Sequence, residues 1–355
     1  MTSLPAGTQQ MPAAPPPGGG RPRSAGARTL KERLIFGVLL LCGFFSVGTM
    51  LMILFILLTN TADFFGHPIQ DVAGNEVTVT PGEFLTGGEW NPLLGAEKHF
   101  GMWPLIVGTL QVAVVAMAFA LPLGLMVAIW LSEYARPKLR AVVKPVLETI
   151  AGVPTVVFGF FALTFITPVL RFSWWPSWMP FGGSEAGGVW NPFDIGTYNV
   201  LAAGLAVGIM CLPIVTSLAE DALRAVPRQL REGSYGLGAS RFETSLKVVL
   251  PAALSGVIAA FLLAVARAVG ETMIVALAAG SLPPNLHESL ASAFDVTHDT
   301  QTMTGYIVQI FLGDVEHGGV EYLSVYAIAF TLFVMTLLLT VGGGAIRARY
   351  RQVYD

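Results

Sequence analysis

Six long apolar segments restrict this chain to a membrane fold. The first, residues 34–59, exceeds the roughly 20 residues that a helix needs to cross the hydrocarbon core of a bilayer. Only 12% of the residues are charged, about half the share in a typical soluble domain. Because a helix satisfies its backbone polar groups internally, we predict an all-α membrane protein with about six transmembrane helices. The other five segments lie at about 103–131, 146–170, 200–218, 252–279 and 322–343.

Prolines and glycines mark special positions inside these segments. Pro122, Pro154 and Pro213 interrupt three of them. Such interruptions are tolerated where neighbouring helices satisfy the freed backbone groups, and transporters often use them. Gly204 and Gly208 form a GxxxG pair, which predicts close packing of the fourth helix against a neighbour.

The distribution of basic residues predicts which loops face the cytoplasm. If all six segments cross the membrane, seventeen of the twenty Lys and Arg residues fall on one side. The other side has only Lys98 and Arg171, and Arg267 lies within the fifth segment. Basic residues are enriched in cytoplasmic loops. Both termini are therefore predicted to be cytoplasmic, and a missed or extra helix would have scrambled this split.

The topology divides the chain into five regions. Residues 1–28 are rich in Pro, Gly and Ala, so we expect a disordered cytoplasmic tail. The first apolar run is longer than the h-region of a signal peptide, and no small-x-small cleavage site follows it, so we expect a retained helix. The remaining regions are the first helix and its flank (29–59), an outer segment (60–102), a helical core (103–345) and a cytoplasmic C-terminus (346–355).

The outer connections are rich in tryptophan and acidic residues. Tryptophans near helix ends are typical of an interfacial belt, and a docking surface for an external protein is the alternative. The tryptophans are Trp90, Trp174, Trp175, Trp178 and Trp190.

The histidines and cysteines do not predict a metal site. His287, His298 and His317 share the last outer loop, but their spacings match no metal-binding pattern. Cys42 and Cys211 lie inside apolar runs, where a free thiol usually packs as a small apolar side chain. We expect solvated loop histidines, packed thiols and no metal.

The connection between the fourth and fifth helices, 220–250, is too long for a structureless loop. Polar, helix-forming stretches flank Gly238, which predicts two short helices joined by a glycine turn. Its charge alone would favour an ordinary basic loop. The spacing of its residues favours the structured alternative.

The connection reads Glu232-Gly233-Ser234, three residues, Gly238, nine residues, then Val248-Val249-Leu250-Pro251. This spacing resembles the EAA loop of ABC importer permeases, which reads Glu-Ala-Ala, three residues, Gly, nine residues, Ile-x-Leu-Pro. The resemblance implies that the short helix before Gly238 docks into a groove of a separate ATPase. In this role Glu232 would make polar contacts and Gly238 would permit the turn. Here Gly233 and Ser234 replace the two alanines, and Val248 replaces isoleucine. The matching elements are Glu232, Gly233, Ser234, Gly238, Val248, Leu250 and Pro251.

Two charged residues lie within the fifth apolar segment. An unpaired charge inside a membrane costs at least ~2.5–3.5 kcal/mol on insertion scales. The four-residue spacing of Arg267 and Glu271 would put both on one helical face, where they can pair. The guanidinium also offers a fork of donors that matches phosphate oxygens. Two interpretations remain: a structural ion pair, or a substrate pathway lined by Arg267, Glu271 and Thr272.

The same segment resembles phosphate-specific transport (Pst) permeases. Residues 267–275, Arg-Ala-Val-Gly-Glu-Thr-Met-Ile-Val, match their corresponding helix, and the ending Met-Ile-Val is closer to the PstC type than to its partner. Residues 151–159, which contain Pro154, Thr155 and Gly159, resemble a second signature of this family. A third stretch that resembles the family consists of residues 122–124 and 130–134. The resemblance covers about 100–345 and implies a type I ABC importer permease fold.

The partners follow from this resemblance and from the absence of a Walker A pattern. We expect this chain to bind no cofactor, with ATP and Mg²⁺ held by a partner ATPase. The family implies a homologous second permease (PstA-type), two ATP-binding subunits (PstB-type) and an external phosphate-binding protein (PstS-type). The complex would import phosphate across the bacterial cytoplasmic membrane, and no nucleic acid is expected.

Two alternatives remain open at the level of the sequence. The substrate could be another oxyanion such as sulfate or molybdate, because an arginine alone does not discriminate among them. The chain could also be an ion-coupled secondary transporter with Arg267 and Glu271 as a relay, although the EAA-like spacing would then be coincidental. A membrane-embedded enzyme is remote, because no intramembrane cluster of His, Asp and Glu supports it.

Overall fold

The structure is a computed structural model that divides into two compact units, Met1–Ile56 and Leu57–Asp355. It describes residues 25–70, 76–93, 98–171, 194–284, 294–313, 315 and 318–349, and most of their side chains. Most of the predicted tail, residues 1–24, lies outside the described residues, as do Trp174, Trp175, Trp178 and Trp190.

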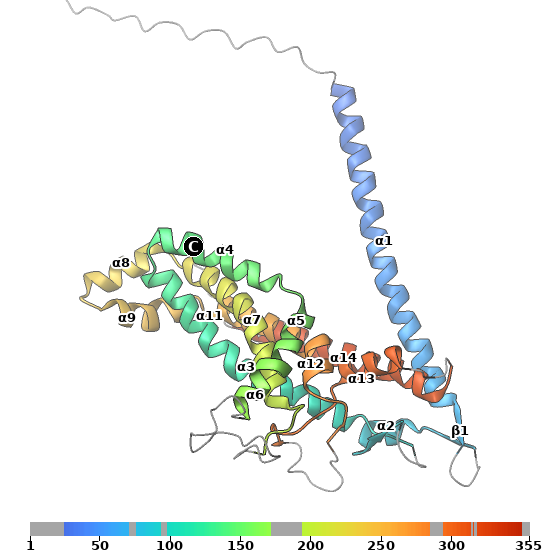
Figure 1. Cartoon of the computed structure of the whole chain (residues 1–355). Helices are drawn as coiled ribbons and strands as arrows, with labels where there is room; N and C mark the ends of the chain where they lie inside the picture. The colour runs from blue at the N-terminus through green and yellow to red at the C-terminus, as the bar shows by residue number, and fades with distance from the viewer. Residues whose placement is uncertain are drawn as a thin grey trace, which may run out of the picture. The chain divides into compact units, whose positions relative to one another are not determined.

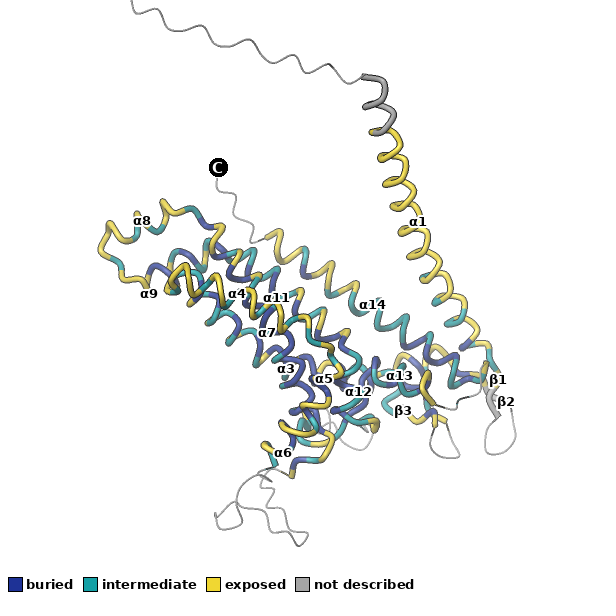
Figure 2. The backbone as a smooth tube through the Cα atoms, turned by 45° about the horizontal axis from the view of Figure 1, so that its top comes forward, coloured by how far each residue is buried: buried dark blue, intermediate teal, exposed yellow. Residues whose placement is uncertain are grey.

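Helix α1 (Ala25–Gly66) makes up the described part of the first unit and continues into the second. It extends the predicted span, 34–59, at both ends. Its apolar side chains are exposed all around the helix, and none of its membrane-spanning window is buried within the chain (Figure 2). A helix that is apolar on every face is typical of a membrane span.

The described residues contain four helices that are long and apolar enough to span a membrane. They are Glu32–Gly66 in α1, Trp103–Tyr134 (α3, Trp103–Ile129, with the π-helical turn η1, Trp130–Tyr134), Val200–Arg224 (α7) and Val320–Arg349 (α14). Two further helix pairs pass the same test but are sharply bent. Counting each bent pair as one span gives the six that the sequence predicts.

The first bent pair corresponds to the third apolar segment. Helix α4 (Pro137–Ala151) meets Thr155–Leu170 at 87°, and the latter comprises α5 (Thr155–Phe161), the π-helical turn η2 (Ala162–Ile166) and α6 (Thr167–Leu170). The break lies at Gly152–Pro154, because proline cannot donate a backbone hydrogen bond and disfavours the helical conformation of the residue before it. Pro122 and Pro213, by contrast, lie inside the unbroken helices α3 and α7.

The second bent pair corresponds to the fifth apolar segment. Arg241–Ala252 meets α11 (Leu254–Val269) at 74°. The predicted continuous helix over 252–279 is wrong. The chain leaves α11 at Gly270 and forms a separate short helix, α12 (Met273–Ala278).

Helices α3 and α7 form the centre of the second unit (Figures 1 and 2). A Cβ at Gly204 would lie 2.6 Å from Val115 Cγ1, and one at Gly208 would lie 2.9 Å from the Ala116 carbonyl oxygen. The two glycines of α7 therefore allow the backbone of α3 to approach closely. The close packing predicted from the GxxxG pair is confirmed.

A smaller aromatic core occupies the end of the unit that contains the outer segment. Phe64, Phe84, Phe100, Trp90 and Tyr306 are all buried there, and the rings of Trp90 and Tyr306 pack edge to face with centroids 4.9 Å apart. The elements around this core are α2 (Pro81–Thr86), α13 (Met303–Leu312), α14 and two antiparallel strand pairs. The pairs are β1 (Pro68–Gln70) with β2 (Glu76–Thr78), and β3 (Trp90–Asn91) with β4 (His99–Phe100). The all-α prediction omitted these strands, because two or three residues give no periodic signal.

Candidate functional site

Arg267 lies in the last turn of α11, immediately before the helix break. Its side chain is exposed in the isolated chain, and its Nη2 lies 3.8 Å from Met210 Sδ on α7. Among the described residues, no carboxylate forms an ion pair with this guanidinium. Most donors of this cation are therefore available to an anion.

Glu271 lies in the break itself and is only 7% exposed. Its Oε1 lies 3.5 Å from the backbone nitrogen of Ile274, so the carboxylate approaches the first turn of α12. Thr304, at the start of α13, donates a 2.7 Å hydrogen bond from its hydroxyl to the carbonyl of Glu271. Thr272 donates to the carbonyl of Gly270 at 3.2 Å. These bonds hold the non-helical peptide between α11 and α12 in a defined conformation.

The predicted pairing of Arg267 with Glu271 is wrong for this conformation. Among the residues that the structure describes, no ion pair joins them. The expectation assumed a continuous helix, in which residues four apart share a face. Because α11 ends at Val269, that spacing does not apply to Glu271. Sequence reasoning also missed Met210 and Thr304, which contact the two residues from other helices.

The motif around Pro154 packs against the segment that follows Glu271. Pro154 precedes α5, and Thr155 is the first residue of that helix. A Cβ at Gly159 would lie 2.9 Å from Leu277 Cδ1 and 3.2 Å from Ile274 Cα, both on α12. The motif therefore allows α5 to lie directly against α12. The structure thus brings two of the predicted groups of site residues together.

The third predicted group forms a knob at the opposite end of the unit from α2 and the strands (Figure 1). Its parts are α8 (Arg228–Gly236), a turn at Gly238, α9 (Arg241–Thr244), the π-helical turn η3 (Ser245–Val249) and α10 (Leu250–Ala252). Gly238 has φ +85°, a conformation that other residues rarely adopt. The prediction of short helices joined at a glycine turn is confirmed.

The polar and apolar residues of the motif have distinct places in this knob. Ser234 on α8 is hydrogen-bonded to Thr244 on α9, with 2.9 Å between the hydroxyl oxygens. Leu250 packs against a buried cluster at the base of the knob. Pro251 is exposed in α10, and the next long helix, α11, starts at Leu254, two residues after the predicted start at 252. Gly233 has open space around its Cα.

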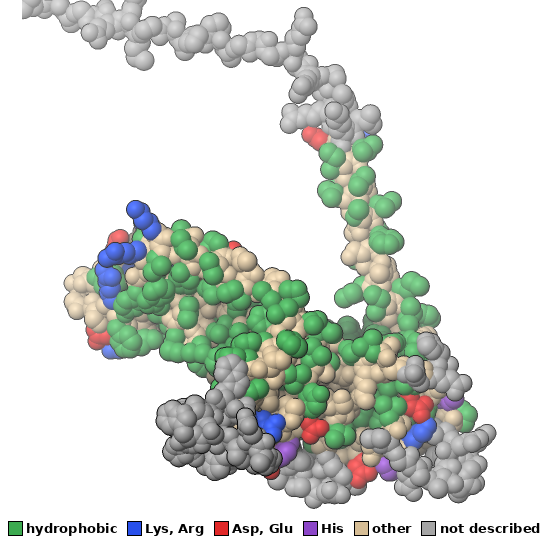
Figure 3. Space-filling model, in the orientation of Figure 1, with side chains coloured by type: hydrophobic (Ala, Val, Ile, Leu, Met, Phe, Trp, Pro, Cys, Tyr) green, Lys and Arg blue, Asp and Glu red, His purple; other side chains and the backbone are tan. Residues whose placement is uncertain are grey.

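The outer surface of the knob combines apolar and charged side chains. Leu237, at the turn, is 91% exposed, and Phe242 is 64% exposed. Glu232 is exposed on α8, and no ion pair from it occurs within the described part of the chain. Basic side chains gather at the same end of the molecule (Figure 3). Exposed large apolar groups beside unpaired charges are typical of a protein interface.

A buried acid lies beneath the knob at the end of α7. The side chain of Glu220 is only 1% exposed. Its carboxylate lies 3.1 Å from Arg140 Nε, 3.0 Å from Lys144 Nζ and 3.7 Å from Arg224 Nε. Arg140 and Lys144 come from α4, so this cluster joins α4 to α7. A glutamate at the end of an apolar run is the one sign of this cluster in the sequence.

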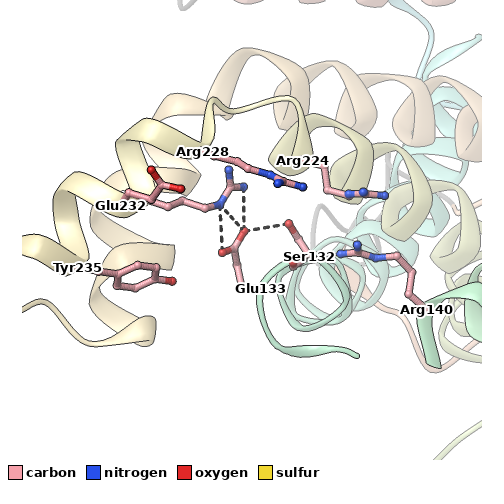
Figure 4. Close-up of a pocket in the computed structure, with 8 residues that line it drawn as sticks. Ser132, Glu133, Arg140, Arg224, Arg228, Glu232 and Tyr235 are labelled. Carbon is pink, nitrogen blue, oxygen red and sulfur yellow. Dashed lines mark hydrogen bonds and ion pairs between the residues drawn. The ribbon is translucent and has the colours of Figure 1, made fainter. Parts of the chain in front are cut away.

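A second charge pair joins α8 to η1. The side chain of Arg231 on α8 contacts both carboxylate oxygens of Glu133, with the shortest distance 3.0 Å between Nη2 and Oε1. The pair lies in the wall of a pocket of about 360 Å³, which Arg140, Arg224 and Glu232 also line (Figure 4). From the sequence, Arg231 is only one of the basic residues in the connection 220–250.

The segment before α13 is held by His298 and Asp295. His298 Nδ1 lies 2.7 Å from Asp295 Oδ2, and this hydrogen bond raises the pKa of His298 above its usual 6.5. Burial alone would raise the pKa of Asp295, but hydrogen bonds from Thr297 and His298 outweigh it and lower the pKa. His287 and His317 lie outside the described residues. No group of three metal-binding side chains occurs in the part of the chain that the structure describes.

We expect the order of this segment to depend on pH. The stability that His298 contributes to the folded segment is fully present below the unfolded pKa of this histidine. It is lost as pH rises through the raised folded pKa. The stability that Asp295 contributes is present above the unfolded pKa of this carboxyl. It is lost as pH falls through the lowered folded pKa. The protection factors of the amides of residues 294–302, which correct the exchange rates for their intrinsic pH dependence, should therefore be highest between the folded pKa values of Asp295 and His298. The variant Asp295→Asn should flatten the profile, and an unchanged profile in that variant would contradict this assignment.

Known proteins resemble this chain in sequence. A model of the family described as "Binding-protein-dependent transport system inner membrane component" matches residues 120–352. The probable ABC transporter permease protein YqgH of Bacillus subtilis is 34% identical over 260 residues, which cover 73% of this chain and 75% of that protein. The phosphate transport system permease protein PstC of Mesorhizobium japonicum is 32% identical over 263 residues, covering 72% and 75%.

A solved structure resembles the chain in fold. A chain of a bacterial alginate ABC transporter, crystallised in complex with its alginate pentasaccharide-bound periplasmic protein, aligns with a TM-score of 0.60. The match covers 93% of this chain and 99% of that one, at 12% sequence identity. At this identity the likeness shows the fold alone.

Proposed function

Because this chain belongs to the family of binding-protein-dependent transport system inner membrane components, we propose that it is a PstC-type permease subunit of an ATP-driven importer of inorganic phosphate. It forms one half of the translocation pathway. It hydrolyses nothing itself, and ATP and Mg²⁺ bind to a partner ATPase.

The observation that carries the substrate proposal is the exposed guanidinium of Arg267. A charge at this depth in a membrane segment is retained for a function or a partner. Among the described residues, the hydrogen-bond partner of Arg267 is a methionine sulfur and no carboxylate pairs with it, so its planar fork of donors remains open to an oxyanion. Glu271, Thr272 and the unwound peptide between α11 and α12 line the same route. The named function of the PstC relative favours phosphate over sulfate or molybdate.

The exposed knob supports docking to an ATPase. Leu237 and Phe242 offer apolar contact area, and Glu232 offers an unpaired charge at the rim. The knob leads through α10 directly into α11, whose 16 residues span about 24 Å. Arg267 lies in the last turn of this helix. One short helix therefore connects the docking segment to the substrate route. A movement imposed on the knob reaches Arg267 through this helix.

The complete importer that we propose contains four kinds of subunit. This chain would pair with a homologous PstA-type permease and two PstB-type ATPases, and would receive phosphate from a PstS-type binding protein. Both termini and the knob would face the cytoplasm, because seventeen of the twenty basic residues lie on that side. Co-expression and purification test this assembly. Recovery of the chain without an ATPase, together with uptake driven by an ion gradient, would favour a secondary transporter instead.

Reversing the charge at Glu232 should weaken ATPase binding. In Glu232→Lys we expect about tenfold less affinity for the ATPase, equivalent to about 1.4 kcal/mol. Since Glu232 is exposed and makes no ion pair within the described chain, the folded permease should be unaffected. Co-purification at graded salt measures the loss.

The matched control is Glu148→Lys, an exposed glutamate on α4 outside the knob. It should leave ATPase binding unchanged. Equal co-purification by wild type and Glu232→Lys would remove Glu232 from the docking surface.

A further inference from the structure

The stretch 130–134 forms η1, and the proposed function gives it no role. Its Glu133 is only 5% exposed and Ser132 donates a 2.9 Å hydrogen bond to its Oε1. The cation that neutralises this buried carboxylate is Arg231, which immediately precedes the Glu232 of the docking motif. The pair therefore connects the knob to the end of α3.

Arg231 also binds the end of α7. Its Nη1 donates to the carbonyl of Val226 at 2.7 Å, and its Nη2 donates to the carbonyl of Leu223 at 2.9 Å. Leu223 lies in the last turn of α7, where carbonyls lack partners within the helix, and Val226 lies just beyond the helix end. The guanidinium donates to both carbonyls. One side chain, only 16% exposed, thus joins α8, η1 and α7.

The rest of α8 is held weakly. None of its residues is buried. Within the described chain, its one ion pair to another element is that of Arg231 with Glu133. Ser234 links it only to α9, inside the knob itself. Arg231 is therefore the main polar connection between the docking helix and the membrane helices.

The chemistry of the contact suits a rigid connection. Contact with both carboxylate oxygens fixes the orientation of a guanidinium as well as its distance. Four donor directions are used at once, two toward Glu133 and two toward backbone carbonyls. A lysine ammonium could keep the charge pair but could not reproduce this planar set.

We propose that Arg231 and Glu133 form the joint through which movement of the docking helix is transmitted to α3 and α7. The proposal rests on the proposed function, since it needs an ATPase bound to the knob. Both are positioning residues, and neither touches phosphate. Without the joint, α8 follows the ATPase while α3 and α7 do not, so ATP is hydrolysed with much less transport.

The test uses the complete importer in proteoliposomes and measures ATP hydrolysis and phosphate uptake together. In Arg231→Gln and in Glu133→Gln, we expect phosphate taken up per ATP to fall about tenfold, within the range of typical couplings between sites. ATPase co-purification and hydrolysis should stay at the wild-type level. In Arg231→Lys, the phosphate taken up per ATP should lie between the values for wild type and for Arg231→Gln. Arg136→Gln, an exposed arginine on the same end of the molecule, should match wild type.

The double variant Arg231→Gln/Glu133→Gln separates a joint from two independent effects. If the two residues form one joint, the double variant should take up no less phosphate per ATP than the worse single variant. If their effects are independent, the two reductions should multiply. An unchanged ratio in the single variants, or a parallel loss of hydrolysis and uptake, would overturn the proposal. If Arg231→Gln fails to assemble, Arg231→Lys decides, and an unchanged ratio there would also overturn it. Failure of the proposed function would appear in the wild-type complex, as hydrolysis without phosphate uptake.

Discussion

Replacing Arg267 with glutamine is expected to reduce phosphate uptake by about a hundredfold or more while the importer stays assembled. Hydrogen bonds to a charged group contribute about 1.5–3 kcal/mol each, and a guanidinium can offer two to one phosphate. Assembly should survive because Arg267 is exposed and its polar contact within the described part of the chain is a 3.8 Å approach to the sulfur of Met210. Its removal leaves no buried carboxylate without a partner.

Uptake of radiolabelled phosphate into proteoliposomes measures this effect, with subunit stoichiometry checked on the same preparation. Arg267→Lys keeps the charge but loses the planar fork, and should be intermediate. Met210→Leu removes the sulfur contact, keeps the cation, and should transport nearly as wild type. Wild-type uptake by Arg267→Gln would remove Arg267 from the pathway.

The largest expected loss of stability comes from Glu220→Gln. This change keeps the size of the side chain but removes a carboxylate that is 1% exposed and faces Arg140, Lys144 and Arg224. Breaking a buried ion pair by removing one partner costs about 3–5 kcal/mol. Because the three cations are partly exposed to water, we expect the lower end, about 3 kcal/mol. Thermal unfolding of the purified complex measures it.

The neighbouring residue provides the control. Asp221 also contacts Lys144, but its side chain is 57% exposed, and exposed pairs contribute about 0–1 kcal/mol. Asp221→Asn should therefore unfold close to wild type. Equal destabilisation by the two variants would mean that burial of Glu220 does not set the strength of this cluster.

Features that depend on local sequence were predicted well. The turn at Gly238 follows from a glycine between two helix-forming stretches, and its positive φ confirms it. The contact of α7 with α3 follows from the spacing of Gly204 and Gly208, because small residues at one-turn spacing admit a neighbouring backbone. The bend before Thr155 coincides with Pro154, which cannot continue the preceding helix.

Features that depend on the third dimension were not predictable. The break at Gly270 lies in a continuous apolar run, and it is held partly by Thr304, which is 33 positions from Glu271 in the chain. Arg231 and Glu133 are 98 positions apart. A count of basic residues gave both Arg231 and Arg140 a side of the membrane but no partner. The acid that each one binds could be known only after α3, α4 and α7 were packed together.

The most direct test of the account is phosphate uptake by the purified four-component importer in sealed vesicles. We predict uptake that requires ATP on the side of the knob, that persists without an ion gradient, and that excess sulfate or molybdate does not suppress. Uptake driven by an ion gradient without ATP would contradict the assignment as an ATP-driven importer. If uptake of labelled phosphate depends on ATP but unlabelled sulfate competes with it as well as unlabelled phosphate does, the assignment of phosphate as the substrate would be contradicted.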